Sequence, residues 1–315
     1  MEISQIGLRN QQIIMTIKEA EDLCRMIRIG VDLSRPKYNY HPKTKEELMV
    51  IVNELIKERG NEADLNDIDV SQITDMSHLF LNSQFNGDIS NWVVSGVKDM
   101  NHMFEESEFN GDISKWNVSR VESMYGMFCN SKFNGDISNW DVSSVRDMED
   151  MFYKSQFNSD ISRWNVSEVK NMNCMFWWSK FNGDISNWNV SKVEKMCLMF
   201  ASSQFNGDIS NWDVSRVVNM GGMFWDSQFN GDISNWNVSN VEDMGWMFEN
   251  SKFNGDISNW NVSKVKDMEK MFKDSQFNGD ISKWDVSKVE NMSYMFENSK
   301  FNGDISKWTK KPGRI

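Results

Sequence analysis

Hydrophobic residues recur along most of this chain with a period of 24 residues. The hexamer Phe-Asn-Gly-Asp-Ile-Ser begins at Phe85 and returns at the same spacing until Phe301. Of its ten copies, one departs from the hexamer, with Ser159 in the place of glycine. A fixed period of this length is typical of solenoids, in which each repeat buries its apolar residues only against its neighbours. We therefore expect the copied positions to build a core, and the positions that differ between copies to form a surface.

The spacing of apolar residues within one copy predicts its local structure. Val97, Met100, Met103 and Phe104 follow at intervals of three, three and one, which is typical of one face of a short helix. A serine precedes each such segment and is a natural N-cap, and four copies complete a capping box with a glutamate. Asn-Gly-Asp is turn chemistry, and the residues after it suffice only for a short strand. The fold class predicted is an α/β repeat solenoid of about ten 24-residue coils, each with a short strand and a short helix.

Residues 1–64 do not repeat and are predicted to form a helical N-terminal cap. Thr16 with Glu19 opens one predicted helix, and Thr44 with Glu47 opens a second that ends before Gly60. Such helices would cover the open end of a solenoid, where core and backbone edges are otherwise exposed. The predicted domains are therefore the cap at 1–64, the solenoid at 65–308 and a basic tail at 309–315.

Composition excludes several classes of function. A net charge of −12 argues against a nucleic-acid or anionic-membrane surface. No apolar run reaches the length of a membrane span, and the N-terminus carries no signal peptide, so a cytoplasmic location is expected. The four cysteines form no disulfide framework or zinc motif, and the three histidines fit no catalytic pattern. We expect no enzyme, no cofactor and no metal site.

The repeat resembles a known family. The pattern V-x-x-M-x-x-M-F-x-x-S-x-F-N-G-D-I-S-x-W-x-V-S, over residues 65–308, is similar to the BspA-like leucine-rich-repeat proteins, in the branch with mycoplasma-lipoprotein-type repeats. The resemblance implies a leucine-rich-repeat-like solenoid. It also implies an extracellular adhesin or binding surface, with cell-surface or secreted location as the alternative to the cytoplasm. We expect this chain to lack that family's leader, lipidated cysteine and wall anchor.

Three polar or aromatic ladders run through the repeats, and two of them have both a structural and a functional interpretation. The aspartates of the hexamer either accept backbone N–H groups in their own turns or bind a row of calcium ions. The asparagines satisfy backbone groups of adjacent coils as buried amides. The tryptophans either fill the core or form an exposed platform for sugars. The candidate calcium ladder comprises Asp112, Asp136, Asp160, Asp184 and Asp208.

The positions equivalent to Asn101, His102, Glu105 and Glu106 differ from copy to copy. They are predicted to lie on the solvent face of the short helix, opposite its Val/Met/Phe face. Aromatic residues gather there, which is an interface signature, although drift on a tolerant surface is the alternative. The candidate partner-binding residues are Tyr125, Tyr153, Trp177, Trp178, Leu198, Trp225, Trp246 and Tyr294.

These observations favour a non-enzymatic scaffold that binds a protein or another macromolecule through this aromatic surface. The alternatives are a carbohydrate- or host-matrix-binding adhesin and a calcium-stabilised structural solenoid. At the last copy, Phe301, Ile305 and Trp308 are expected to remain accessible, because no amphipathic segment follows them. A homodimer through this C-terminal coil is therefore a further possibility, set against a monomer blunted by Lys310, Lys311 and Pro312.

Overall fold

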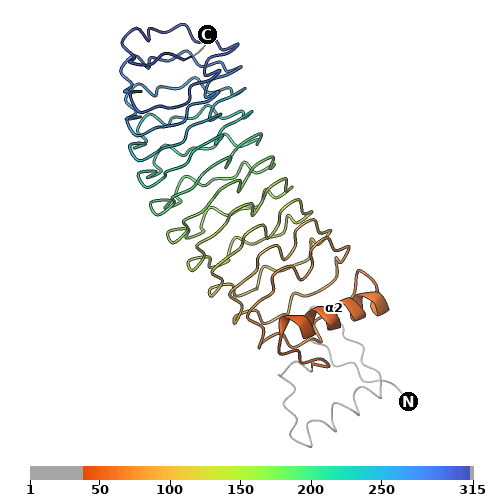
Figure 1. The fold of residues 1–315 in the computed structure, drawn as a ribbon. Helices are drawn as coiled ribbons and strands as arrows, with labels where there is room; N and C mark the ends of the chain where they lie inside the picture. Colours follow the sequence, from red (N-terminus) through yellow and green to blue (C-terminus); the bar gives the residue numbers. More distant parts are fainter. Residues whose placement is uncertain (1–37, 313–315) are drawn as a thin grey trace, which may run out of the picture. The chain divides into compact units, whose positions relative to one another are not determined.

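The computed structural model describes residues 38–312. The chain divides into two units, residues 1–39 and 40–315, and the elements described below belong to the second unit. The helix expected to open at Thr16 lies outside the described residues. Within the second unit, coils of the chain follow one another from α2 onward (Figure 1).

Helix α2, Lys45–Arg59, is the helix that the sequence predicts from Thr44 and Glu47. The Oγ1 atom of Thr44 accepts the backbone N–H of Glu47 at 3.2 Å, and Gly60 ends the helix with φ of 88°. Leu48, Val52 and Leu55 are buried in the same core cluster as the coils. This prediction is confirmed, because a capping box and a glycine stop are local signals that need no tertiary context.

The coils stack in register as a repeat solenoid. Nine parallel β-bridges join residues 24 apart, from Asp75–Asp99 to Asp267–Asn291. They are isolated bridges: among residues 38–312, α2 is the one helix and no longer strand forms. The short strand and short helix expected in every coil are therefore absent from the described part of the chain, and each coil is built from turns.

Hydrogen bonding explains why turns replace the expected helix. The N–H groups of Met100, His102, Phe104 and Glu106 donate to carbonyls of the next coil at 2.7 to 3.2 Å, and those of residues 103, 105 and 107 donate to the carbonyl three residues back. A two-turn helix would have left backbone N–H and C=O groups without partners in the neighbouring coils. A helix this short is also unstable on its own. Two residues per coil adopt left-handed backbone to make this ladder, as His102 and Glu106 do with φ of 55° and 54°.

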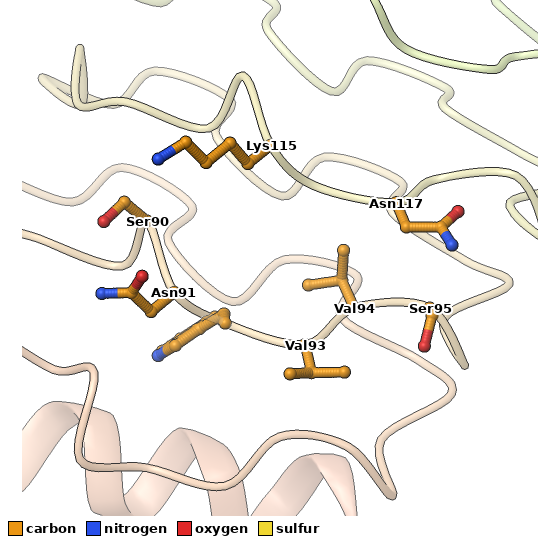
Figure 2. Close-up of a pocket in the computed structure, with 8 residues that line it drawn as sticks. Ser90, Asn91, Val93, Val94, Ser95, Lys115 and Asn117 are labelled. Atoms are coloured by element: carbon orange, nitrogen blue, oxygen red, sulfur yellow. The ribbon is translucent and has the colours of Figure 1, made fainter. Parts of the chain in front are cut away.

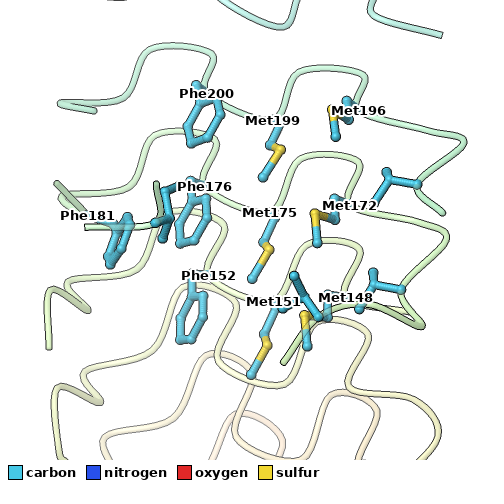
Figure 3. Packing of buried hydrophobic residues seen from close by; sticks show 14 of the residues in the cluster. Met148, Met151, Phe152, Met172, Met175, Phe176, Phe181, Met196, Met199 and Phe200 are labelled. Atoms are coloured by element: carbon cyan, nitrogen blue, oxygen red, sulfur yellow. The ribbon is translucent and has the colours of Figure 1, made fainter. Parts of the chain in front are cut away.

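The core is made of side chains that stack on their own copies. Met148, Met151 and Phe152 are fully buried, and Figure 3 shows each of them continued by the equivalent residue of the next coil. The Phe152 and Phe176 rings lie 5.7 Å apart, 7° from parallel. The apolar spacing of the sequence thus predicts the buried face correctly although it predicts the wrong element, because a run of three-residue turns brings the same positions inward.

Candidate functional site

The positions equivalent to Asn101, His102, Glu105 and Glu106 form a surface that we call the variable ridge. Trp178, Trp246 and Tyr294 are its exposed aromatic residues, with 52%, 41% and 53% of their surface accessible. The other five predicted partner-binding residues, contrary to the expectation that all point to solvent, are half-buried. They are Tyr125, Tyr153, Trp177, Leu198 and Trp225.

Backbone conformation separates the exposed aromatic residues from the half-buried ones. Trp178, Trp246 and Tyr294 occupy left-handed positions, with φ of 55°, 56° and 60°. The half-buried aromatic residues stand at the ridge positions that are not left-handed; they are Tyr125, Tyr153, Trp177 and Trp225. Leu198 is left-handed but half-buried. Bulky residues rarely adopt this conformation. The helix expected from the sequence would have given all four positions the same backbone.

The aromatic residues of two successive coils form one cluster. The rings of Tyr153 and Trp177 lie 4.8 Å apart, and the ammonium nitrogen of Lys154 lies 5.0 Å from the ring centres of both Tyr153 and Trp178. The Nε1 atom of Trp177 is buried and, among the described residues, has no hydrogen-bond partner. The cluster therefore presents aromatic faces that already hold a cation of the chain itself.

Half-buried acidic groups stand on the variable ridge or at the bridge position just before it. Burial raises the pKa of Asp150 to about 6, and the neighbouring charge of Glu149 adds to the rise. Burial also raises the pKa of Asp243 and that of Glu249. The Cys197 thiol is half-buried, and burial raises its pKa to about 11. Lys270 and Lys273 oppose the rise in the pKa of Glu249, and the carboxylates of Asp150, Asp243 and Glu249 together favour a negative potential on this surface.

Two histidines are brought together in a way that the sequence analysis does not anticipate. His78 and His102 occupy equivalent positions of successive coils, and their rings stack 4.8 Å apart. The Nδ1 atom of His102 lies 2.6 Å from a carboxylate oxygen of Glu105. Their spacing of 24 residues is the signal that could have found the pair. The arrangement holds no nucleophile in contact with a base, so it gives no support to catalysis.

The aspartate ladder serves the turns. Asp112, Asp136, Asp160, Asp184 and Asp208 each accept, through Oδ1, the backbone N–H of the serine two residues on, at 2.9 Å. The hydrogen bond from Ser138 holds the pKa of Asp136 below its ordinary value. Within residues 38–312, no group of three or more His, Cys, Asp or Glu side chains is placed to hold a metal ion. The geometry matches the turn interpretation of the ladder.

The asparagine and tryptophan ladders both tie neighbouring coils together. The Oδ1 atom of Asn110 accepts the backbone N–H of Asn134 at 2.8 Å, as predicted, but these amides are exposed rather than buried. The ladder from Trp92 to Trp308 is 3% to 4% accessible, and each indole N–H donates to a carbonyl of the preceding coil. Burial rules out the exposed sugar platform that the sequence left open.

An open depression of about 380 Å³ lies apart from the variable ridge. Val93, Val94 and Ser95 line it from one coil, and Lys115 and Asn117 from the next (Figure 2). Val93 is 44% accessible, whereas most copies place an asparagine or aspartate at its position. The depression brings together no group with catalytic or metal-binding chemistry.

The C-terminal coil differs from expectation. Phe301 and Trp308 are 8% and 4% accessible, so the predicted open layer is largely covered. The reason is the segment that follows, in which Pro312 is buried and the Lys311 ammonium donates to the carbonyl oxygen of Ile305. In the preceding coils, the equivalent carbonyl accepts a tryptophan N–H, as Ile281 does from Trp308. Lysine thus takes the place of the missing indole.

The geometry of the coils agrees with a comparison of the sequence with protein families. The family described as "Mycoplasma protein of unknown function, DUF285" matches residues 51–156, 129–204, 154–252 and 227–313. The chain belongs to this family. Its four overlapping matches follow the stacked coils, so the family corresponds to the repeat itself. No curated protein and no solved structure matches the chain. No helix within residues 38–312 is long and apolar enough to cross a membrane.

Proposed function

We propose that the chain is a non-enzymatic scaffold that binds a protein partner through the variable ridge. One observation carries the proposal: the three exposed aromatic residues, Trp178, Trp246 and Tyr294, stand at left-handed backbone positions. A non-glycine residue in this conformation costs about 1 kcal/mol or more. Glycine occupies the same positions at Gly126 and Gly222, so the fold itself does not need a side chain there.

A large exposed aromatic side chain at a position where glycine also serves the fold indicates a role outside folding. Large aromatic side chains dominate protein interfaces, where a few anchors commonly contribute about 2 kcal/mol or more each. The copied positions of the repeat, by contrast, are engaged in the core, in turns or in hydrogen bonds between coils. The ridge is therefore the surface on which the copies are free to differ, and the surface on which recognition would be encoded.

A carbohydrate- or matrix-binding adhesin is the second candidate, and the resemblance to BspA-like surface proteins favours it. Such a function would use the exposed indoles of Trp178 and Trp246, because the tryptophan ladder is buried. A glycan array probed with the full chain tests it directly. A calcium-stabilised solenoid is the third, and its test is a chelator, which should lower the melting temperature if calcium supports the coils.

The leading proposal is tested by comparing two variants in capture of interacting proteins from a lysate of the host cell. The ridge variant carries Trp178→Ser, Trp246→Ser and Tyr294→Ser. The matched control carries Val50→Ser, Val93→Ser and Val218→Ser, which change equally exposed apolar residues elsewhere. Proteins retained by the natural chain and by the control should be lost from the ridge variant. Equal retention by all three proteins would show that the ridge is not the binding surface.

A further inference from the structure

The central stretch of the variable ridge, taken with the bridge position before it, carries more carboxylates than cations. Between residues 147 and 250, the ridge and the bridge position that precedes it in each coil hold six carboxylates against two lysines, Lys154 and Lys195. Within the described residues, none of the six carboxylates forms an ion pair. They are Asp147, Glu149, Asp150, Asp226, Asp243 and Glu249.

Two glycines pack closely against acidic groups in the second half of this stretch and just beyond it. Gly221 and Gly245 stand where other coils carry side chains such as Tyr125 and Glu149. A Cβ atom at Gly221 would lie 3.2 Å from Oδ2 of Asp243, and one at Gly245 would lie 3.3 Å from Oδ1 of Asp267. A side chain at either position would therefore crowd a carboxylate, and glycine avoids this contact next to Trp246.

The aromatic residues of the same stretch are placed to receive cations. Lys154 already lies 5.0 Å from the ring centre of Trp178, and Lys270 lies 6.0 Å from that of Trp246. Arginine suits such a surface best, because its planar guanidinium binds a carboxylate through two hydrogen bonds and also stacks on an indole. An acidic surface of this kind repels phosphate groups, which excludes nucleic acid as the ligand.

We propose that the ridge between Asp150 and Glu249 docks an extended, arginine-bearing segment of a partner protein. This inference rests on the proposed function and adds the chemistry of the partner. The arginines would pair with these carboxylates, several of which also accept hydrogen bonds from the chain, and their guanidinium planes would stack on Trp178 and Trp246. Four coil spacings of ~4.8 Å separate the two ends of this stretch, a distance that about six extended residues span.

Binding of a fluorescein-labelled decapeptide of alternating arginine and serine tests the proposal, measured by anisotropy at physiological salt. The carboxylate variant carries Asp150→Asn, Asp243→Asn and Glu249→Gln in the full chain. The matched control carries Asp136→Asn, Asp184→Asn and Asp232→Asn, which remove the same charge from the aspartate ladder. Affinity for the arginine peptide should fall at least about tenfold in the carboxylate variant and less than about twofold in the control. A decapeptide of alternating glutamate and serine should not bind.

Equal losses in the two variants would show attraction to net charge alone and overturn the proposal, as would no loss in either. Melting curves establish that both variants are folded. A second pair of changes, Trp178→Ser with Trp246→Ser, should also weaken the arginine peptide severalfold, and unchanged affinity would contradict the stacking. If the ridge variant loses captured proteins while the arginine peptide binds the natural chain and the carboxylate variant equally well, the scaffold function stands and this inference fails. If capture is unchanged, the proposed function itself fails.

Discussion

The indole N–H of Trp188 donates to the backbone carbonyl of Ile161 at 3.1 Å, across 27 residues of sequence. The same bond recurs in every coil from Trp92 to Trp308. Its two partners are buried, with Trp188 3% and Ile161 1% accessible. A carbonyl in such a place has no access to water, so its only acceptable environment is a donor from the next coil. The tryptophan ladder therefore both fills the core and satisfies buried backbone carbonyls.

Replacing Trp188 with phenylalanine should destabilise the chain by about 2 kcal/mol or more, because it leaves the Ile161 carbonyl unpaired and a small void beside it. Urea unfolding followed by circular dichroism measures the change. Trp246→Phe is the matched control, since that indole is 41% accessible, and it should stay within about 0.5 kcal/mol of the natural chain. Equal effects at the two sites would contradict the role given to the buried N–H.

The repeat period gave the solenoid and its core, because each coil must bury the same positions against identical neighbours. Met100, Met103 and Phe104 are fully buried as their spacing predicts. The local conformation could not be read from that spacing, since a helix face and a run of turns share it. The choice between a helix and turns depends on hydrogen bonds to the next coil. Those bonds join residues 23 apart, as the bond between His102 and Tyr125 does.

The candidate site was predicted in position but not in exposure. Its variable positions follow from comparing the copies of the repeat. The left-handed backbone at Trp178 and the half-burial of Trp177 depend instead on the hydrogen bonds between turns of successive coils.

These hydrogen bonds also give each coil a direction, because N–H groups of one coil donate to carbonyls of the next. Within the described residues, the N–H groups of Met292, Tyr294 and Phe296 donate to no carbonyl. A two-fold contact through this row would oppose donor to donor, so a homodimer through the C-terminal coil gains no hydrogen bonds from it.

Val93→Asn should stabilise the chain by roughly 0.5 to 1 kcal/mol. In the next coil, Oδ1 of Asn117 accepts the N–H of Ser119 at 3.1 Å, whereas Val93 offers Ser95 no acceptor. The change also removes an exposed apolar side chain. Thermal and urea unfolding both report the gain. Val218→Asn, which alters a residue of the same exposure outside any such turn, should leave the stability within about 0.5 kcal/mol. A gain confined to Val218 would refute the turn argument.

Gly183→Ala should destabilise the chain by about 1 to 3 kcal/mol, because the added Cβ would lie 2.8 Å from the buried ring of Phe181. At the one copy that carries serine, the Oγ atom of Ser159 donates to the Asn134 carbonyl at 2.9 Å, which offsets part of the crowding. Gly96→Ala is the control, since its nearest neighbours would be 3.5 Å away. Unfolding curves that rank the two alanine variants in the opposite order would count against this reading of the hexamer glycine.

Asp150→Asn should stabilise the chain at pH 7.5 by on the order of 1 to 2 kcal/mol, and the gain should vanish below about pH 4. Burial, with Glu149 and Glu105 adding to it and Cys174 and His102 opposing it, raises the pKa of Asp150 from 3.8 to about 6. The folded state therefore holds the proton more tightly than the unfolded state. Stability is fully present below the unfolded pKa and is lost as pH rises from about 4 through about 6.

Asparagine removes that loss and tolerates the left-handed backbone of Asp150, whose φ is 55°. Urea unfolding at pH 4, 5, 6 and 7.5 measures the effect. The control is Asp136→Asn, because the pKa of Asp136 is lowered by its hydrogen bond from Ser138 and its contribution is present at high pH. Its substitution should bring no gain at pH 7.5. A gain at Asp150 that is independent of pH would mean that packing, and not the buried charge, separates the two residues.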